Sequence, residues 1–390
     1  MDIFQKEFIS LIQAAFTQKQ GTVSDDFDWS KAVSLAKKHN IAAILYYGAR
    51  NSGVSEASAD MQELFTLTYK SMMVSQRQTN EIKRILAAFE AEGIDHMPLK
   101  GTILKSLYPQ PEMRTMGDAD ILIRTEQYGR IEEIMKGLGF TFRRETDHEL
   151  VWVKPSLFLE LHKRVMTTYN ADFYRYFGDG WKIANRVNDS GRYEMSPEDF
   201  YIYLFVHFTK HYRISGIGIK HLLDLWVYSE AFPELNREYI RDEMKKMNLS
   251  RFYENVLHTI NVWFRGERET DISDVITGVI FSSGQYGSVE MAVVNRALRD
   301  SKGSPLKIRL AKTVKHMFLP YQAMKAKYKV LEKLPFLLPI MWIVRWFDIL
   351  FIRRRLFKRY MGEMKQINSQ SVEENRDALQ FVGLDFDFQG

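Results

Sequence analysis

Two carboxylates stand directly before an aliphatic run in the stretch 96–123. Asp118 and Asp120 flank one alanine, and the run Ile-Leu-Ile at 121–123 follows at once. Such a run favours a β-strand, in which residues i and i+2 point to the same face. We therefore expect the two side chains to lie close together, where their charges repel unless a cation lies between them. Oxygen ligands of this kind suit Mg²⁺ or Mn²⁺, usually with substrate phosphates as further ligands.

A glycine turn upstream and an isolated carboxylate downstream extend this pattern. Lys100-Gly101-Thr102 opens a short helical segment, and the backbone N–H groups at such a turn attract an anion. Glu160 lies in an otherwise apolar strand candidate, where a charged side chain usually needs a partner or a metal, and His162 shares its face. With the Asp pair, these residues predict a site for a metal-bound polyphosphate, in which three carboxylates serve in-line phosphoryl or nucleotidyl transfer.

The pattern of apolar residues predicts an α+β chain, with a small mixed β-sheet flanked by N-terminal and C-terminal helical regions. We expect strands over 94–99, 119–124, 149–154 and 157–162. We expect helices over 4–16, 28–45, 57–92, 126–137, 198–212, 220–231, 236–264, 273–281 and 289–300. The predicted division is an N-terminal helical region at 1–92, an α/β core at 93–195, a helical lid at 196–300, and a basic C-terminal helical segment and tail at 301–390.

The composition narrows the class of protein. The 390-residue chain has no cysteine, which excludes disulfides, zinc–thiolate sites and a cysteine nucleophile. Its first residues carry Asp2, Lys6 and Glu7 among apolar side chains and lack the features of a secretory signal. No window holds the roughly eighteen uncharged apolar residues that a membrane span needs. We therefore expect a cytoplasmic protein.

Positive charge is concentrated in the segment 302–360, which holds 15 Lys and Arg against only Glu332 and Asp348. The total of +5 therefore leaves −8 for the rest of the chain, so we expect no nucleic-acid partner. Within this segment, residues 334–359 combine large apolar side chains, two tryptophans and a basic flank, which is typical of a membrane-surface helix. Two interpretations stay open: peripheral contact with an anionic inner membrane, or a helix packed on the body with a solvated basic end.

The motifs around the Asp pair resemble the nucleotidyltransferase superfamily of DNA polymerase β and the antibiotic nucleotidyltransferases. That signature is an apolar residue, Gly, then Gly or Ser, a spacer, and Asp, apolar, Asp or Glu, apolar. The Lys-Gly-Thr turn at 100–102 and the Asp-Ala-Asp-Ile run at 118–121 are similar to it, with Thr102 where the superfamily has Gly or Ser. More narrowly, residues 99–122 look like the largely uncharacterised bacterial branch that is often linked to polysaccharide loci. The resemblance covers about 90–230.

This resemblance implies that a nucleoside monophosphate is transferred from an NTP, expected to be ATP, with release of pyrophosphate. By the resemblance, Asp118 and Asp120 hold Mg²⁺ or Mn²⁺. Glu160 completes the metal site or acts as the base that deprotonates the acceptor. Gly101 and Thr102 would contact phosphate.

Basic residues complete the expected binding site. By the same resemblance, Lys100 neutralises phosphate charge, and Arg114 either contacts phosphate or fixes a loop through an ion pair. The helical lid could bring Lys210 or Lys220 to the nucleotide phosphates. Two alternatives stand for these helices: a zinc site formed by His207, His211 and Asp224, or residues at the edge of the core whose hydrogen bonds are satisfied within the protein.

This hypothesis specifies the NTP donor but not the acceptor. A glycan precursor fits the resemblance, followed by a protein side chain and then a small antibiotic. The rival from a different class is a catalytically silent nucleotide-binding or membrane-peripheral scaffold in polysaccharide biosynthesis. The presence of three carboxylates favours the enzyme, because a silent copy has no chemical need for a complete metal site.

Overall fold

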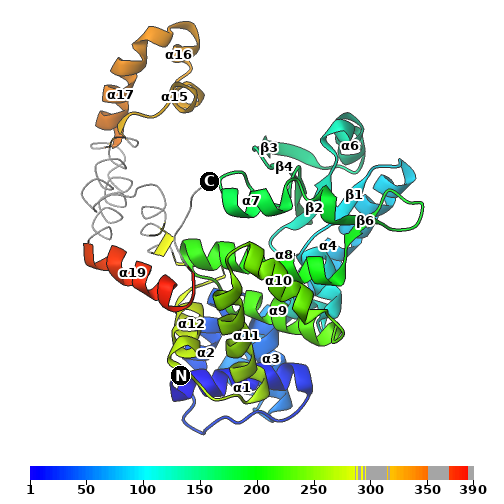
Figure 1. Ribbon diagram of the computed structural model, residues 1–390, viewed down its shortest axis with the longest axis vertical. Coiled ribbons are helices and arrows are strands. Elements are labelled where there is room, and N and C mark those ends of the chain that lie inside the picture. Colours follow the sequence, from blue (N-terminus) through cyan, green and yellow to red (C-terminus); the bar gives the residue numbers. More distant parts are fainter. Residues whose placement is uncertain are drawn as a thin grey trace.

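A computed structural model describes residues 1–285, 287–288, 291–292, 295, 314, 317–349 and 369–384. It confirms the predicted α+β class, because helices at both ends of the chain surround one small mixed sheet (Figure 1). Most of the helix expected over 289–300, and the basic clusters at 302–312 and 353–359, lie outside this part of the chain.

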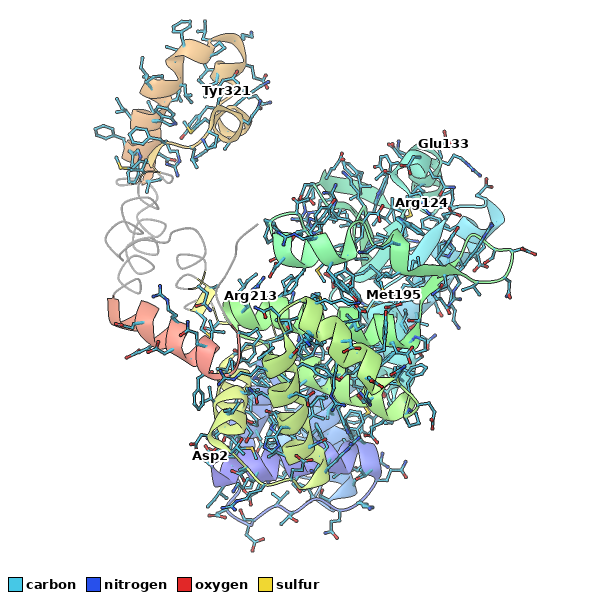
Figure 2. All side chains as sticks on the ribbon, viewed as in Figure 1. Asp2, Arg124, Glu133, Met195, Arg213 and Tyr321 are labelled. Atoms are coloured by element: carbon cyan, nitrogen blue, oxygen red, sulfur yellow. The ribbon has the colours of Figure 1, made fainter. Side chains whose placement is uncertain are left out.

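Four helices precede the sheet: α1 (Ile3–Thr17), α2 (Trp29–His39), α3 (Ala42–Asn51) and α4 (Ala59–Ala91). The carboxylate of Asp2, labelled in Figure 2, caps α1 by accepting from the backbone N–H of Gln5. α4 confirms the helix predicted over 57–92. The single helix predicted over 28–45 is wrong, because the chain turns at Asn40 with a φ of 56°, a left-handed conformation that asparagine tolerates.

The main sheet has the strand order β1-β2-β5-β4-β3. Its strands are β1 (His96–Pro98), β2 (Ala119–Ile123), β3 (Thr141–Glu145), β4 (Glu149–Lys154) and β5 (Leu157–His162). β2 and β5 run parallel, and the other neighbours run antiparallel. The hairpin of β4 and β5 has the predicted bounds, and β1 is shorter than expected. β3 was not predicted because all five of its residues are exposed and most are polar, so the sequence shows no alternation there.

The two faces of the sheet differ in chemistry because alternate residues of each strand point to opposite sides. One face is apolar and packs against the second half of α4 and against α6 (Tyr128–Gly137) (Figure 1). The core between this face and the two helices includes Ile82, Ile85, Phe89, Ile121, Ile131, Met135, Trp152, Leu159 and Leu161. The opposite face carries Asp120, Glu160 and His162.

Helices follow the sheet as predicted. They are α7 (Ala171–Phe177), α8 (Pro197–Ser215), α9 (Ile219–Ala231), α10 (Arg237–Lys246), α11 (Ser250–Arg265) and α12 (Asp271–Ser282). A two-stranded sheet of β6 (Ala184–Arg186) and β7 (Tyr193–Met195) lies between α7 and α8. The continuous helix predicted over 236–264 is wrong, because Asn248 breaks it with a φ of 61°.

The helices before and after the sheet share one hydrophobic core. The ring of Phe8 in α1 lies 5.8 Å from that of Phe281 in α12, and Phe16 lies 5.0 Å from Trp226 in α9. Aromatic pairs at these distances add to the stability that burial provides. The domain boundaries at 92, 195 and 300 stay predictions, but the two helical regions pack as partners.

The remaining helices, most of them short, complete the described chain. They are α5 (Gly101–Leu104), η1 (Lys105–Leu107), η2 (Pro111–Met113), η3 (Thr125–Gln127), η4 (Trp181–Ile183), α15 (Tyr321–Lys327), α16 (Val330–Lys333), η5 (Pro335–Leu337), α17 (Leu338–Phe347) and α19 (Ser369–Phe381). Val382, just after α19, is buried and accepts through its carbonyl from the side chain of Asn255 at 2.9 Å. No helix in the described residues is long and apolar enough to cross a membrane.

His39 joins three helices at the end of α2. Its Nδ1 accepts from the backbone N–H of Ile219 at 3.2 Å, and its Nε2 lies 3.4 Å from the carbonyl oxygen of Phe281. Burial lowers the pKa of His39 to about 4, against a smaller upward effect of the Phe281 carbonyl. The ring is therefore neutral in the folded protein at pH 7.

We predict that acid destabilises the fold in part through His39. Between its usual pKa of 6.5 and its folded value of about 4, the unfolded chain binds a proton here that the folded chain does not, so stability falls as pH falls. The loss is about 2 kcal/mol between pH 7 and pH 5. Urea unfolding at pH 7 and pH 5 should show a smaller loss for His39→Gln than for the wild type. Equal losses would contradict this role.

Candidate functional site

The polar face of the sheet and the helices α8 and α9 enclose a cavity of about 340 Å³. It brings together most of the residues that the sequence singled out: Lys100, Gly101, Arg114, Asp118, Asp120, Glu160, His162, His207, Lys210, His211, Lys220 and Asp224. Thr102 does not line the cavity, and its buried hydroxyl has no hydrogen-bond partner in the described part of the chain.

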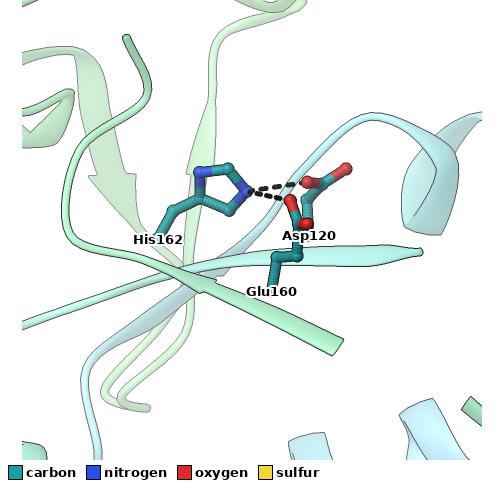
Figure 3. Close-up of side chains that lie close together, drawn as sticks. All are labelled: Asp120, Glu160 and His162. Carbon is teal, nitrogen blue, oxygen red and sulfur yellow. Dashed lines mark hydrogen bonds and ion pairs between the residues drawn. The ribbon is translucent and has the colours of Figure 1, made fainter. Parts of the chain in front are cut away.

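The parallel pairing of β2 with β5 places Asp120 directly beside Glu160. Paired residues of neighbouring strands point to the same face, so both carboxylates face the cavity. His162 shares this face, and its Nε2 lies 2.7 Å from Asp120 Oδ1 and 3.7 Å from Glu160 Oε2 (Figure 3). One ligand atom from each of the three residues lies within 4.8 Å of the other two. This spacing suits a single divalent cation.

Asp118 lies two residues before Asp120, just outside β2, and lines the same cavity. Burial raises the pKa of Asp118, and the negative charge of Asp120 adds to that effect, while Lys100 and Lys220 oppose it. Asp118 does not belong to the three-residue ligand cluster. The structure thus groups Asp120 and Glu160 with His162, and it adds Asp118 as a further carboxylate in the same space.

The two paired carboxylates are held in different charge states. Burial raises the pKa of Asp120, but Lys100 and His162 outweigh it, so the pKa lies below its usual range. The Nζ of Lys100 lies 3.5 Å from Asp120 Oδ2. For Glu160, burial together with the negative charges of Asp118 and Asp120 raises the pKa to about 8. The cluster therefore lacks positive charge, which a bound divalent cation would supply.

The turn at Lys100 has an uncommon backbone conformation, with a φ of 35°. Such a conformation is costly for a residue with a side chain and persists only where the surrounding packing fixes it. The absence of a side chain at Gly101 allows Met116 to pack closely against this turn, because a Cβ at position 101 would lie only 2.9 Å from Met116 Sδ. The turn places the amine of Lys100 beside Asp120.

Arg114 and Asp224 form a buried, two-pronged ion pair. Arg114 Nε donates to Asp224 Oδ1 at 2.6 Å, and Nη2 donates to Oδ2 at 2.8 Å. The hydroxyl of Tyr108 also donates to Asp224 Oδ1, and Arg114 Nη1 donates to the carbonyl of Thr115. Of the two interpretations offered for Arg114, the structure shows the ion pair that fixes a loop. The pair ties the segment before β2 to α9.

The zinc alternative lacks support. The Nε2 atoms of His207 and His211 lie 3.1 Å apart, but Asp224 is engaged by Arg114. Within the described part of the chain, the three-residue group with metal-ligand spacing is the one at Asp120, and it includes neither of these histidines.

Sequence reasoning missed His148, Glu149 and His221, which also line the cavity. Glu149 begins β4 and pairs with His162. The Nε2 of His148 lies 3.0 Å from the carboxylate of Glu149. The contact with His148 lowers the pKa of Glu149 to about 2. The alternation of β4, whose first, third and fifth residues share the polar face, could have revealed Glu149. No sequence signal marks the two histidines.

Comparison with known proteins agrees with the geometry. The cavity holds clustered carboxylates on the sheet face together with lysines from α8 and α9, and the sequence matches the model of an uncharacterised nucleotidyltransferase family over residues 25–265. The chain belongs to this family, which confirms the resemblance and supports a nucleotidyltransferase activity. No curated protein matches the sequence. A solution structure of the antibiotic-resistance factor ANT(2'')-Ia is similar over 46% of this chain and 97% of its own, with 14% identity and a TM-score of 0.33.

We predict that Asp224→Ala lowers the free energy of unfolding by about 3–5 kcal/mol, because it leaves the buried guanidinium of Arg114 without its partner. The double variant Arg114→Met/Asp224→Leu should recover most of that loss. Glu254→Ala, which removes an exposed ion pair with Arg241, serves as control and should cost about 0–1 kcal/mol. Urea unfolding measures all three. A double variant as unstable as Asp224→Ala would contradict the prediction.

Proposed function

We propose that this chain is a metal-dependent nucleotidyltransferase that moves a nucleoside monophosphate from an NTP, expected to be ATP, to an acceptor. The observation that carries the proposal is the cluster of Asp120, Glu160 and His162 on one sheet face, with Asp118 in the same cavity. Lysines of α8 and α9 line the cavity opposite these carboxylates. Carboxylates facing cations suit a triphosphate that arrives with a divalent metal.

The donor set fits Mg²⁺ or Mn²⁺. Carboxylate oxygens from Asp118, Asp120 and Glu160 are the ligands that these cations prefer, while the imidazole of His162 holds Asp120 in place through its Nε2 at 2.7 Å. When bound, the cation supplies positive charge to the phosphates. His162 keeps its Nε2 toward both carboxylates, and Lys100 keeps Asp120 ionised, so the ligands are arranged before substrate arrives.

The reaction forms a bond between the acceptor oxygen or nitrogen and the α-phosphorus and breaks the bond from that phosphorus to the bridging oxygen. Pyrophosphate and one proton are released. Glu160, with its pKa raised to about 8 by burial and nearby carboxylates, is suited to take that proton where it is not a metal ligand. Lys100 and Lys210 would neutralise phosphate charge, while Arg114 holds the segment that leads to Asp118.

The acceptor classes remain those that the sequence suggested: a glycan precursor, a protein side chain or a small molecule, and not a nucleic acid. The competing proposal is a catalytically silent nucleotide-binding scaffold in polysaccharide biosynthesis. Turnover separates the two, because only the enzyme releases pyrophosphate from an NTP in a reaction that requires Asp120.

We predict that an NTP with Mn²⁺ raises the melting temperature of the wild type, since a ligand that binds the native state stabilises it. A ligand at about 100 times its Kd adds roughly 2.7 kcal/mol. Asp118→Asn and Asp120→Asn should lose most of this shift, whereas Glu126→Gln, an exposed carboxylate in η3, should keep it. An unchanged shift in both site variants, or no shift in the wild type, would refute the proposed site.

We further propose that residues 334–359 contact an anionic membrane surface. Four apolar side chains are exposed on one side of η5 and α17: Phe336 (73%), Ile340 (55%), Ile343 (59%) and Phe347 (60%). Their spacing of four, three and four residues places them on one helix face. The indole N–H groups of Trp342 and Trp346 donate instead to the carbonyls of Leu319 and Met317. The surrounding segment is strongly basic, which complements anionic lipid.

We predict that the protein binds vesicles containing phosphatidylserine at low salt and not neutral phosphatidylcholine vesicles. Ile340→Asp with Ile343→Asp should weaken binding at least about tenfold. Each change removes apolar area that the membrane would bury, which is worth more than about 1 kcal/mol of binding free energy. Phe65→Asp, at an equally exposed apolar position on α4, is the matched control. Co-sedimentation in which the wild type stays in solution, or the double variant still binds, would count against the proposal.

A further inference from the structure

A second cavity, of about 370 Å³, lies outside the candidate site. Residues of α2, the middle of α4, η1 and the segment before β2 line it. Its volume lies in the range of roughly 300–1,000 Å³ that is usual for small-molecule sites. The lining combines apolar side chains, hydroxyl and amide groups, and lysines: Ala36, Lys37, Asn40, Ala42, Leu67, Lys70, Ser71, Val74, Ser75, Gln78, Lys105, Thr115 and Met116.

Two chain segments separate this second cavity from the candidate site. In the run through α5 and η1, Leu104 lines the candidate site and Lys105 lines the second cavity. In the segment before β2, Thr115 lines the second cavity, Asp118 lines the candidate site, and Met116 contributes to both. A ligand in the second cavity would therefore occupy a position of its own, away from the clustered carboxylates.

Hydrogen bonds hold the wall between the two cavities in place. The hydroxyl of Thr115 donates to the carbonyl of Asn40 at 2.8 Å, and the side-chain amide of Gln78 donates to the carbonyl of Met116 at 3.0 Å. From the other side, Lys220 Nζ donates to the carbonyl of Thr115 at 3.2 Å. The second cavity is therefore formed before any ligand binds, which lowers the entropic cost of binding.

The charged side chains that line the second cavity are of one sign. Among its described lining residues are three lysines and no carboxylate. Lys37, which is exposed, pairs with Glu63 at 2.7 Å, and Lys70 is exposed to solvent. A concave surface lined by one sign of charge attracts the opposite charge, so this cavity favours an anion.

Lys105 is the buried member of the three lysines, with only 7% of its surface exposed. Its Nζ lies 3.5 Å from Gln78 Oε1, and it forms no ion pair with any described residue. The nearby carboxylate of Glu112 instead accepts from the hydroxyl of Tyr47 at 2.5 Å. Burial and the charge of Arg114 lower the pKa of Lys105 to about 8, although Glu112 opposes them. Buried charges are usually paired, and an anion in the cavity would be the missing partner.

Hydrogen-bonding groups follow one face of α4 along the cavity. Ser71, Ser75 and Gln78 lie at spacings of four and three residues, so they share a helix face, and all three line the cavity. Leu67 and Val74 also line it, and Val74 is 49% exposed. The cavity thus presents hydroxyl donors and a lysine beside an apolar surface.

We propose that this second cavity binds a phosphate monoester that carries an apolar body. The phosphate would bind the amine of Lys105 and accept hydrogen bonds from Ser71 and Ser75, while the apolar body contacts Leu67 and Val74. A phosphate fits better than a carboxylate, because its charge near −2 and its three strong acceptor oxygens match several lysines and hydroxyls.

The test titrates phenyl phosphate by calorimetry into the whole chain, without nucleotide or divalent metal. We expect phenyl phosphate to bind at least tenfold more tightly than inorganic phosphate, which lacks the apolar body, and than benzoate, which carries a single charge. Lys105→Met keeps the bulk of the side chain but removes the amine, and should weaken binding at least tenfold. Val74→Asp, at an exposed position, should also weaken it, because it places a negative charge at the cavity. Thermal unfolding of each free variant checks that it folds.

Two control variants locate the probe. Lys83→Met, at an exposed position on α4 outside the cavity, should leave the affinity within twofold, and so should Lys210→Met, which removes an amine of the candidate site. The proposal is overturned if phenyl phosphate does not bind, if inorganic phosphate or benzoate binds as tightly, or if Lys105→Met and Val74→Asp bind like the wild type. Loss of binding in Lys210→Met alone would place the probe in the candidate site and would overturn it equally. None of these outcomes depends on nucleotidyl transfer.

Discussion

The parallel pairing of β2 with β5 is the interaction on which the site depends. This register aligns Asp120 with Glu160 and Leu122 with His162, so that three polar side chains meet on one face. A shift of one residue would turn Glu160 and His162 into the apolar face, against α4 and α6. The hairpin of β4 and β5 secures the register from the other side, since Glu149 pairs with His162 and Val151 with Glu160.

That alignment concentrates negative charge at the junction of two hydrophobic cores, and the fold offsets the repulsion with fixed cations. Lys100 reaches Asp120 from a strained turn, and the loop before β2 is held by the ion pair of Arg114 with Asp224 in α9. The carbonyl of Thr115, between that arginine and Asp118, accepts from both Arg114 and Lys220. Helix α9 therefore positions the carboxylate of Asp118 through this loop and not by direct contact.

The sequence was informative where periodicity decides the outcome. Strand alternation predicted that Glu160 and His162 share a face, as Asp118 and Asp120 do, and the β4–β5 hairpin has its predicted bounds. Only the β2–β5 register brings Asp120 beside Glu160. Pairings across long sequence separations escaped prediction, as with Arg114 and Asp224, because no periodic signal links α9 to a loop 110 residues earlier. The break at Asn40 was missed because apolar spacing continues through it, and only the tolerance of asparagine for a left-handed backbone explains the turn.

Packing also bears on how substrates reach the cavity. α8 is buried along most of its length, and the ring of its Phe205 lies 5.1 Å from that of Tyr253 in α11. A swing of α8 away from the sheet would expose these side chains to water, at about 1.5–3 kcal/mol for each large one. Helix α8 is therefore better suited to form a fixed wall than a moving cover. In that case the lysines that α8 and α9 bring to the cavity stay in place before substrate binds.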